Sequence, residues 1–191
     1  ASVALVIGSE QIISALFGYG SFAENSVINS SNALYYFGLG LPAFALIKVF
    51  STFFFAYQDT KTPFYISLAS VILNILISVY FFKDIGFIII PMATTISSWF
   101  NSIILFIFLK NNDLFSFNEI FLKKFVKIVF ASITMGVFFQ YLILLFENQL
   151  SYSYYFKSVY LVLCVLLTMI FYFVLSYFIK AFNYQDIKLN Y

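Results

Sequence analysis

The chain has 191 residues, of which 63% are apolar and only 9% are charged, and its net charge is +2. So little charge excludes an ordinary soluble domain, in which about 25% of residues are charged, and so much apolar surface excludes a disordered chain. The sequence has no histidine and one cysteine, which excludes internal disulfides, zinc sites and histidine-dependent catalytic triads. The small net charge does not indicate nucleic acid as a partner. The composition is that of an integral membrane protein.

The chain starts with a short apolar segment. Residues 3–9 are apolar or small, Glu10 begins a polar interruption, and the apolar run resumes as far as Phe17. No basic residue precedes Lys48, so the basic flank of a signal peptide is missing. We therefore expect residues 1–22 to be the end of a membrane helix that begins in a longer protein.

Longer apolar runs follow at about residues 33–57, 64–82, 85–109, 125–146 and 158–179. A helix of 22 residues is about 33 Å long and crosses a hydrocarbon core of about 30 Å. None of the runs shows the alternating polarity of a membrane β-strand. The predicted fold is all-α: one membrane domain formed by a polytopic transmembrane bundle, with five full spans and the end of a sixth.

Short polar segments separate the runs. The first of them consists of Asp59, Thr60, Lys61, Thr62 and Pro63. Thr62 is the expected N-cap of the following helix, and Pro63 its expected first residue. We interpret Asp59 as a turn or capping residue rather than a catalytic carboxylate.

The later connections also carry turn and boundary signals. Residues 83–86 (KDIG) predict a tight return. Residues 110–124 are polar and have room for a short interfacial helix, and residues 147–157 are rich in tyrosine, which is typical of a membrane–water boundary.

The lysines predict the orientation. One side of the membrane would carry Lys61, Lys110, Lys123, Lys124, Lys127, Lys180 and Lys188, and the other only Lys83 and Lys157. The positive-inside bias places the larger group, together with the C-terminus, in the cytoplasm. Residues 18–32 then form an external loop.

Polar side chains recur at helical spacing in two of the runs. In the second run these are Ser67, Ser70, Asn74 and Ser78, and in the third Thr94, Ser98 and Asn101. Such stripes usually join neighbouring membrane helices through hydrogen bonds. Ser70, Asn74 and Asn101 are also candidates to line a substrate cavity. The case is stronger for the two asparagines, because a buried amide must satisfy several hydrogen-bonding groups. The last two runs are nearly all apolar, so we expect them to face mostly lipid.

Lys48 is the most informative single residue. It lies 11 residues before Asp59, about 16 Å along the helix and thus near the bilayer centre, where a lysine costs about 2.5–3.5 kcal/mol. Intramembrane charges usually mark substrate or ion pathways, which makes Lys48 a cavity candidate. The alternative is a structural pair with a carboxylate, for which Glu10 is the nearest choice.

Three residues interrupt the same helix and are hinge candidates: Gly38, Gly40 and Pro42. A static proline kink is the alternative. Catalytic and metal-binding motifs are not recognisable in the sequence, and Cys164, in an apolar span, is interpreted as a small buried hydrophobe. We expect no enzyme activity, no catalytic residues, no metal and no cofactor.

Two neighbouring segments, residues 38–49 (GLGLPAFALIKV) and 54–63 (FFAYQDTKTP), carry a recognisable pattern. They resemble the sequence GL-aF-l-KV followed by FYA-xDTkTP of the bacterial lipid II flippases of the MurJ (MviN) family. Residues 16–22 (LFGYGSF) resemble its LFxRGxF segment, with Tyr19 in place of the usual arginine. Residues 93–101 (ATTISSWFN) resemble its AtsisawvNa segment, and Asn74 falls where the family commonly has an asparagine. The resemblance covers residues 1 to about 110, and beyond them only the layout agrees.

The resemblance implies the C-terminal lobe of a fourteen-helix exporter of the multidrug/oligosaccharidyl-lipid/polysaccharide superfamily, from the end of helix nine. It implies a monomeric protein of the bacterial inner membrane in which two lobes rock about a cavity. The implied substrate is an undecaprenyl-linked peptidoglycan precursor, held by its anionic pyrophosphate and sugars. Residues 59–63 would be a loop motif of the family. The alternatives are another exporter of the superfamily, for polysaccharide lipids or drugs, and a polytopic scaffold without transport.

Overall fold

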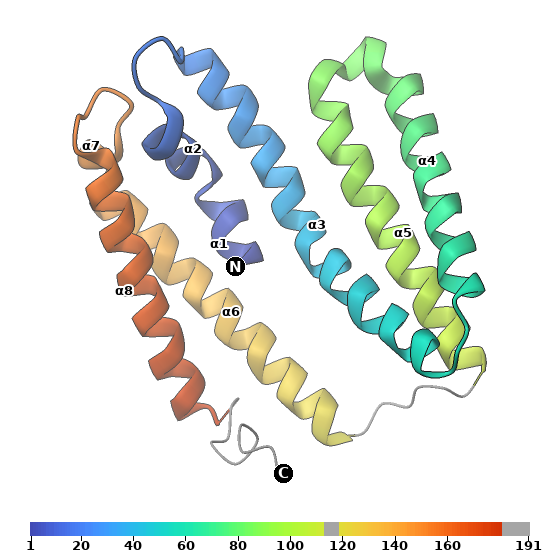
Figure 1. Ribbon diagram of the computed structural model, residues 1–191. Helices are drawn as coiled ribbons and strands as arrows, with labels where there is room; N and C mark the ends of the chain where they lie inside the picture. Colours follow the sequence, from blue (N-terminus) through green and yellow to red (C-terminus); the bar gives the residue numbers. More distant parts are fainter. Residues whose placement is uncertain (113–118, 181–191) are drawn as a thin grey trace.

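The computed structural model of the chain describes residues 1–112 and 119–180. In that part the secondary structure is helical, and the helices run up and down past one another (Figure 1). They are α1 (Ser2–Ile7), α2 (Ser9–Phe17), α3 (Glu24–Ala56), α4 (Lys61–Ile85), the 3-10 helix η1 (Gly86–Ile88), α5 (Ile89–Asn111), α6 (Glu119–Leu145), α7 (Glu147–Leu150) and α8 (Lys157–Phe178).

Four continuous helical segments of the described chain are long and apolar enough to cross a membrane. One of them, Lys61–Asn111, contains both α4 and α5 and folds back on itself where they meet (Figure 1). Gly86 makes this return possible with a φ of 74°, a value that side chains other than glycine rarely allow. The predicted all-α polytopic membrane fold is thus confirmed. The predicted return is found, but it lies at Gly86–Ile88, because α4 continues through residues 83–85.

The helix ends differ from the apolar runs in a consistent way. α3 begins at Glu24, so the expected external loop over residues 18–32 was wrong and only residues 18–23 connect α2 to α3. Likewise α6 begins at Glu119, within the segment where a short separate helix was expected, of which residues 113–118 lie outside the described part. Hydropathy marks where a helix enters lipid, whereas polar residues can continue the helix beyond the membrane.

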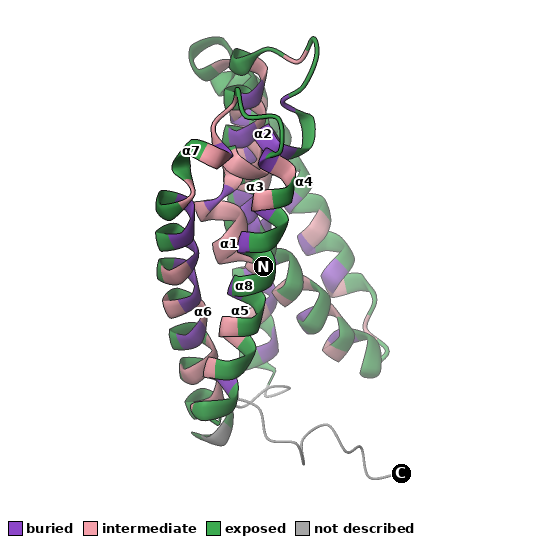
Figure 2. Cartoon of the chain, turned by 90° about the vertical axis from the view of Figure 1, so that its left-hand side faces the viewer, coloured by how far each residue is buried: buried purple, intermediate pink, exposed green. Residues whose placement is uncertain are grey.

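The helices form two groups joined by the N-terminal segment. α5 packs against both α3 and α4, while α6 packs against α8. The short helices α1 and α2 contact α3 on one side and the α6–α8 pair on the other (Figure 1). Buried positions lie where helices contact their neighbours, above all on α5 between α3 and α4, and much of the outer surface of the long helices is exposed (Figure 2).

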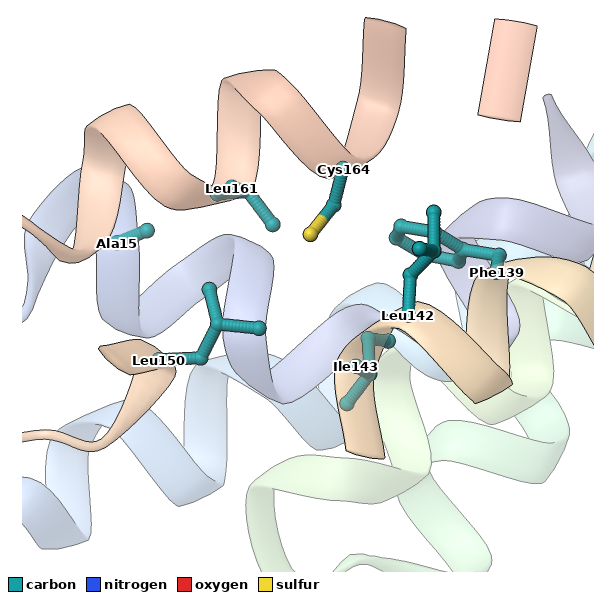
Figure 3. Packing of buried hydrophobic residues seen from close by; sticks show 7 residues of the cluster. All are labelled: Ala15, Phe139, Leu142, Ile143, Leu150, Leu161 and Cys164. Atoms are coloured by element: carbon teal, nitrogen blue, oxygen red, sulfur yellow. The ribbon is translucent and has the colours of Figure 1, made fainter. Parts of the chain in front are cut away.

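Two apolar cores correspond to the two groups. Figure 3 shows the first, in which side chains of α2, α6, α7 and α8 converge: Ala15, Phe139, Leu142, Ile143, Leu150, Leu161 and Cys164. The second core joins α3, α4 and α5 through Phe50, Phe54, Ile66, Leu105 and Leu109. Cys164 has no exposed surface, as expected for a small buried hydrophobe.

Candidate functional site

Asp59 organises the loop between α3 and α4. Its Oδ1 accepts hydrogen bonds from the backbone amides of Lys61, at 3.0 Å, and Thr62, at 3.1 Å. The expectation that Thr62 caps α4 was therefore wrong: α4 already begins at Lys61, the Asp59 carboxylate bonds the first amides, and Pro63 is the third helical residue. Hydrogen bonds from the Thr62 side chain, then from the Thr62 and Lys61 amides, lower the pKa of Asp59. The capping interpretation of Asp59 is confirmed.

The proline of α3 has a specific partner in α1. Pro42 has no N–H, so the carbonyl of Gly38, four residues earlier, lacks its helical donor. The Ser2 hydroxyl donates to that carbonyl. The contact is close, because a Cβ on Gly38 would come within 3.0 Å of the Val6 side chain.

The opposite side of α3 is held by α5. Thr95 Oγ1 donates to the carbonyl of Tyr36 at 2.6 Å, and Trp99 Nε1 donates to that of Leu39 at 3.1 Å. A Cβ on Gly40 would lie 3.0 Å from Thr95 Oγ1. The lack of a side chain at Gly40 therefore allows α5 to approach α3 closely. Gly38, Gly40 and Pro42 thus lie where α3 touches two neighbours, and their role as a hinge stays a prediction.

The polar stripes of α4 and α5 face each other. Asn74 Nδ2 donates to Thr94 Oγ1 at 3.1 Å and to Ser97 Oγ at 3.2 Å. Both hydroxyls donate in turn to carbonyls of α5, those of Ile90 and Thr94. Asn74 therefore connects the two helices, the arrangement expected of polar residues that join membrane helices.

The two other polar cavity candidates are more deeply buried. Ser70 is 6% exposed and donates to the carbonyl of Ile66 in its own helix. Asn101 is 7% exposed, and its Nδ2 lies 3.4 Å from Ser67 Oγ. Its Oδ1 accepts no hydrogen bond from the described residues. Their role toward a substrate stays a prediction.

Lys48 lies exposed on α3, eight residues and about 12 Å before the helix ends at Ala56. No carboxylate of the described residues lies within ion-pair distance of its ammonium group. The alternative of a pair with Glu10 is therefore not found in this structure, since Glu10 lies on α2 and lines a cavity with other carboxylates. The Lys48 charge is available to a partner from outside the described chain.

Lys157 is a buried cation that the sequence analysis used only for orientation. It begins α8, is 1% exposed, and its Nζ donates to the carbonyls of Gly18, at 2.6 Å, and Tyr152, at 2.7 Å. The ammonium also lies 4.5 Å from the ring centres of Tyr19 and Tyr152. It thereby joins the α2–α3 connection to α8. The sequence signal was a lysine within a run of tyrosines, with a further tyrosine at residue 19.

Metal chemistry has no support in the described residues. No group of three histidine, cysteine, aspartate or glutamate side chains within residues 1–112 and 119–180 could hold a metal ion. The arrangement offers hydrogen-bonding groups between helices and an exposed lysine on α3, which suit the binding of polar or anionic groups.

Comparison with known proteins places the chain in a family. The family model described as "Lipid II flippase MurJ" matches residues 1–161, so the similarity continues into α8, well beyond residue 110. Similar relatives named "Probable lipid II flippase MurJ" occur in Buchnera aphidicola (33% identity over 74% of this chain), Rhizobium tropici (30% over 100%) and Thermotoga maritima (36% over 71%). The aligned part makes up 26%, 36% and 27% of those relatives, so the chain spans about a quarter to a third of their length. The chain belongs to the lipid II flippase MurJ family.

Proposed function

We propose that the chain is part of a lipid II flippase of the bacterial inner membrane. The protein would move the undecaprenyl-pyrophosphate-linked precursor from the cytoplasmic to the outer leaflet for cell wall synthesis. The family match over residues 1–161 carries this proposal, and the membrane-spanning helices support it. Transport would occur by alternating access, with this chain forming much of one of the two rocking parts. The protein acts as a monomer.

Lys48 is the proposed contact to the anionic headgroup. It is exposed on an apolar helix and makes no ion pair with the described carboxylates. Ser70, Asn74 and Asn101 line or support the cavity, with Asn74 fixing α4 against α5. Gly38, Gly40 and Pro42 allow α3 to bend as access alternates.

The proposed orientation has the C-terminus in the cytoplasm. Single cysteines at Lys61, Lys124 and Lys188, in a background without Cys164, should then resist an impermeant thiol reagent in intact cells. Cysteines at Asp84 and Ser151 should react. Reaction of the cysteine at residue 61 together with protection of the cysteine at residue 84 would show that the chain has the opposite orientation in the membrane.

The transport proposal is tested in vesicles that contain fluorescent lipid II in both leaflets. The full-length protein should make the fluorescent lipid of the inner leaflet accessible to an impermeant quencher. The 191-residue chain alone should not, because one rocking part has no opposite part against which to alternate. Transport of a different lipid-linked saccharide in place of lipid II would indicate that the protein functions as another exporter of the superfamily. Unaltered accessibility with every lipid would favour a scaffold.

A further inference from the structure

Three side chains of neighbouring helices donate hydrogen bonds to the backbone of α3 just before its proline, Pro42. The donors are Ser2 of α1 and Thr95 and Trp99 of α5, and the acceptors are the carbonyls of Gly38, Tyr36 and Leu39, respectively. A carbonyl inside a helix ordinarily accepts only the amide four residues later, and the three acceptors lie within about one helical turn. Side chains from two directions thus converge on one short stretch of α3.

The bond from Ser2 differs in kind from the two bonds from α5. Pro42 has no N–H, so the Gly38 carbonyl lacks its helical donor, and the Ser2 hydroxyl takes the place of that donor. The carbonyls that α5 reaches have ordinary amide donors four residues later, at positions 40 and 43. The bonds from α5 are therefore additional, whereas the bond from Ser2 replaces one that the proline removes.

The two sides of α3 also differ in how firmly they are held. On the α5 side, Thr95 is 8% exposed and Trp99 adds a second side-chain bond. On the α1 side, the Ser2 hydroxyl supplies the one side-chain bond that reaches this stretch within the described part of the chain. Gly8 separates α1 from α2, so α1 can shift without carrying α2 along. The α1 side is thus the side that can be released.

Release of the Ser2 hydroxyl has a definite consequence for α3. The Gly38 carbonyl would then be left without a donor inside the membrane, where an unpaired backbone group is costly. A helix that bends at a proline tilts such a carbonyl outward, toward another donor or water. Losing the bond therefore favours a more bent α3.

We propose that Ser2 is the latch of a hinge in α3. Its hydroxyl holds α3 in the shape seen here, and its release allows α3 to bend at Pro42 while Thr95 and Trp99 keep the helix on α5. Ser2 is thus a positioning residue, which acts through the backbone of α3. The inference deepens the proposed function, from which it takes the bending of α3 as access alternates.

The test measures the shape of α3 in the full-length protein, purified in detergent and without lipid II. Spin labels on Ile28→Cys and Val49→Cys, at exposed positions of α3 on either side of Pro42, report the distance between its two halves by pulsed electron paramagnetic resonance. All other cysteines, Cys164 included, are replaced by alanine. Bending shortens this distance. Ser2→Ala should increase the fraction of short distances about threefold, the effect of one average hydrogen bond between membrane helices.

Pro42→Ala provides the decisive background. With alanine at position 42, a backbone N–H bonds the Gly38 carbonyl and the Ser2 hydroxyl becomes redundant. Ser2→Ala should then leave the distances unchanged. Ser2→Thr, which keeps the hydroxyl, should behave like the native chain. Ser132→Ala is the matched control, because the Ser132 hydroxyl bonds the Ile128 carbonyl of its own helix, and it should have no effect on α3.

Thr95→Val separates a latch from an ordinary contact. It removes a bond that replaces no missing donor, so its effect on the distances should be the same with proline and with alanine at position 42. The latch is overturned if Ser2→Ala leaves the distances unchanged in the native background, or changes them equally in both backgrounds. The distances do not depend on transport, so a native protein that flips no lipid would overturn the proposed function and not the latch.

Discussion

The contact between α4 and α5 and the contact between α6 and α8 are built from different chemistry. The first is bridged by the Asn74 amide, which reaches two hydroxyls of the facing helix. The second contains rings and aliphatic side chains, with Phe138 stacked on Phe171 at a centroid distance of 4.3 Å and Phe139 and Cys164 fully packed nearby. Lipid is as apolar as these side chains, so neither contact gains from a hydrophobic effect between helices.

The difference between the two contacts suggests that one mainly supplies packing energy and the other mainly sets the relative orientation of the helices. A hydrogen bond between membrane helices contributes only about 0.6 kcal/mol on average, whereas removing a large packed side chain forfeits many van der Waals contacts at once. We infer that the polar α4–α5 contact mainly fixes how the two helices are rotated, while the apolar cores supply most of the packing energy. Substitutions in the two contacts should therefore differ in size.

The largest loss is expected from Phe139→Ala. Phe139 is 1% exposed and contributes to the core shown in Figure 3, so the substitution leaves a cavity and forfeits many van der Waals contacts, which should cost clearly more than the roughly 0.6 kcal/mol of a polar contact between membrane helices. Phe173→Ala, on the exposed side of α8, is the matched control. Thermal unfolding in detergent should show a large drop for the first variant and little change for the second. Equal drops would mean that the core is not packed as described.

Lys157→Met should have the next largest effect, because it breaks the connection between α8 and the α2–α3 segment. The carbonyls of Gly18 and Tyr152 would lose their donor, and leaving such buried acceptors unpaired costs about 1–3 kcal/mol. Lys83→Met, at an exposed lysine, serves as the control. Hydrogen exchange should increase over residues 18–23 only in the Lys157 variant. Unaltered exchange there would contradict the contact.

Asn74→Leu should cost little, about 0.6 kcal/mol and at most about 1.7 kcal/mol. The Thr94 and Ser97 hydroxyls keep their own bonds to α5 carbonyls, so no buried donor is left unpaired. Thermal unfolding measures the loss, with Thr134→Val as the reference, because the half-buried Thr134 hydroxyl bonds only within its own helix α6. A loss as large as that of Phe139→Ala would show that the polar contact supplies strength as well as orientation.

The smallest effect is expected at the Asp59 cap, and it should depend on pH. The pKa of this carboxyl is lowered in the folded chain, so its stabilisation is fully present above the usual value of 3.8 and is lost as pH falls through the lower folded value. The difference in melting temperature between the native chain and Asp59→Asn should therefore be visible near pH 7 and shrink near pH 3. A difference that is constant with pH would contradict the cap.

The sequence predicted the helical class and the order of the helices well, because hydropathy directly reports burial in lipid. It also predicted the capping role of Asp59 and the burial of Cys164. Helix ends were missed at Glu24 and Glu119, since polar turns of helix outside lipid carry no hydropathy signal. The Lys157 contacts join residues far apart in the chain, and no spacing rule brings such residues together.

The central claim is that Lys48 contacts the anionic headgroup of a transported lipid, and Lys48→Met in the protein as its gene encodes it tests this most directly. Folding should be retained, because no described carboxylate would be left unpaired and an expensive charge is removed. Flipping of lipid II in vesicles should fall about tenfold or more, since a hydrogen bond to a charged group is lost. Lys48→Arg should keep part of the activity. A well-folded Lys48→Met protein that flips lipid II at the normal rate would contradict the claim.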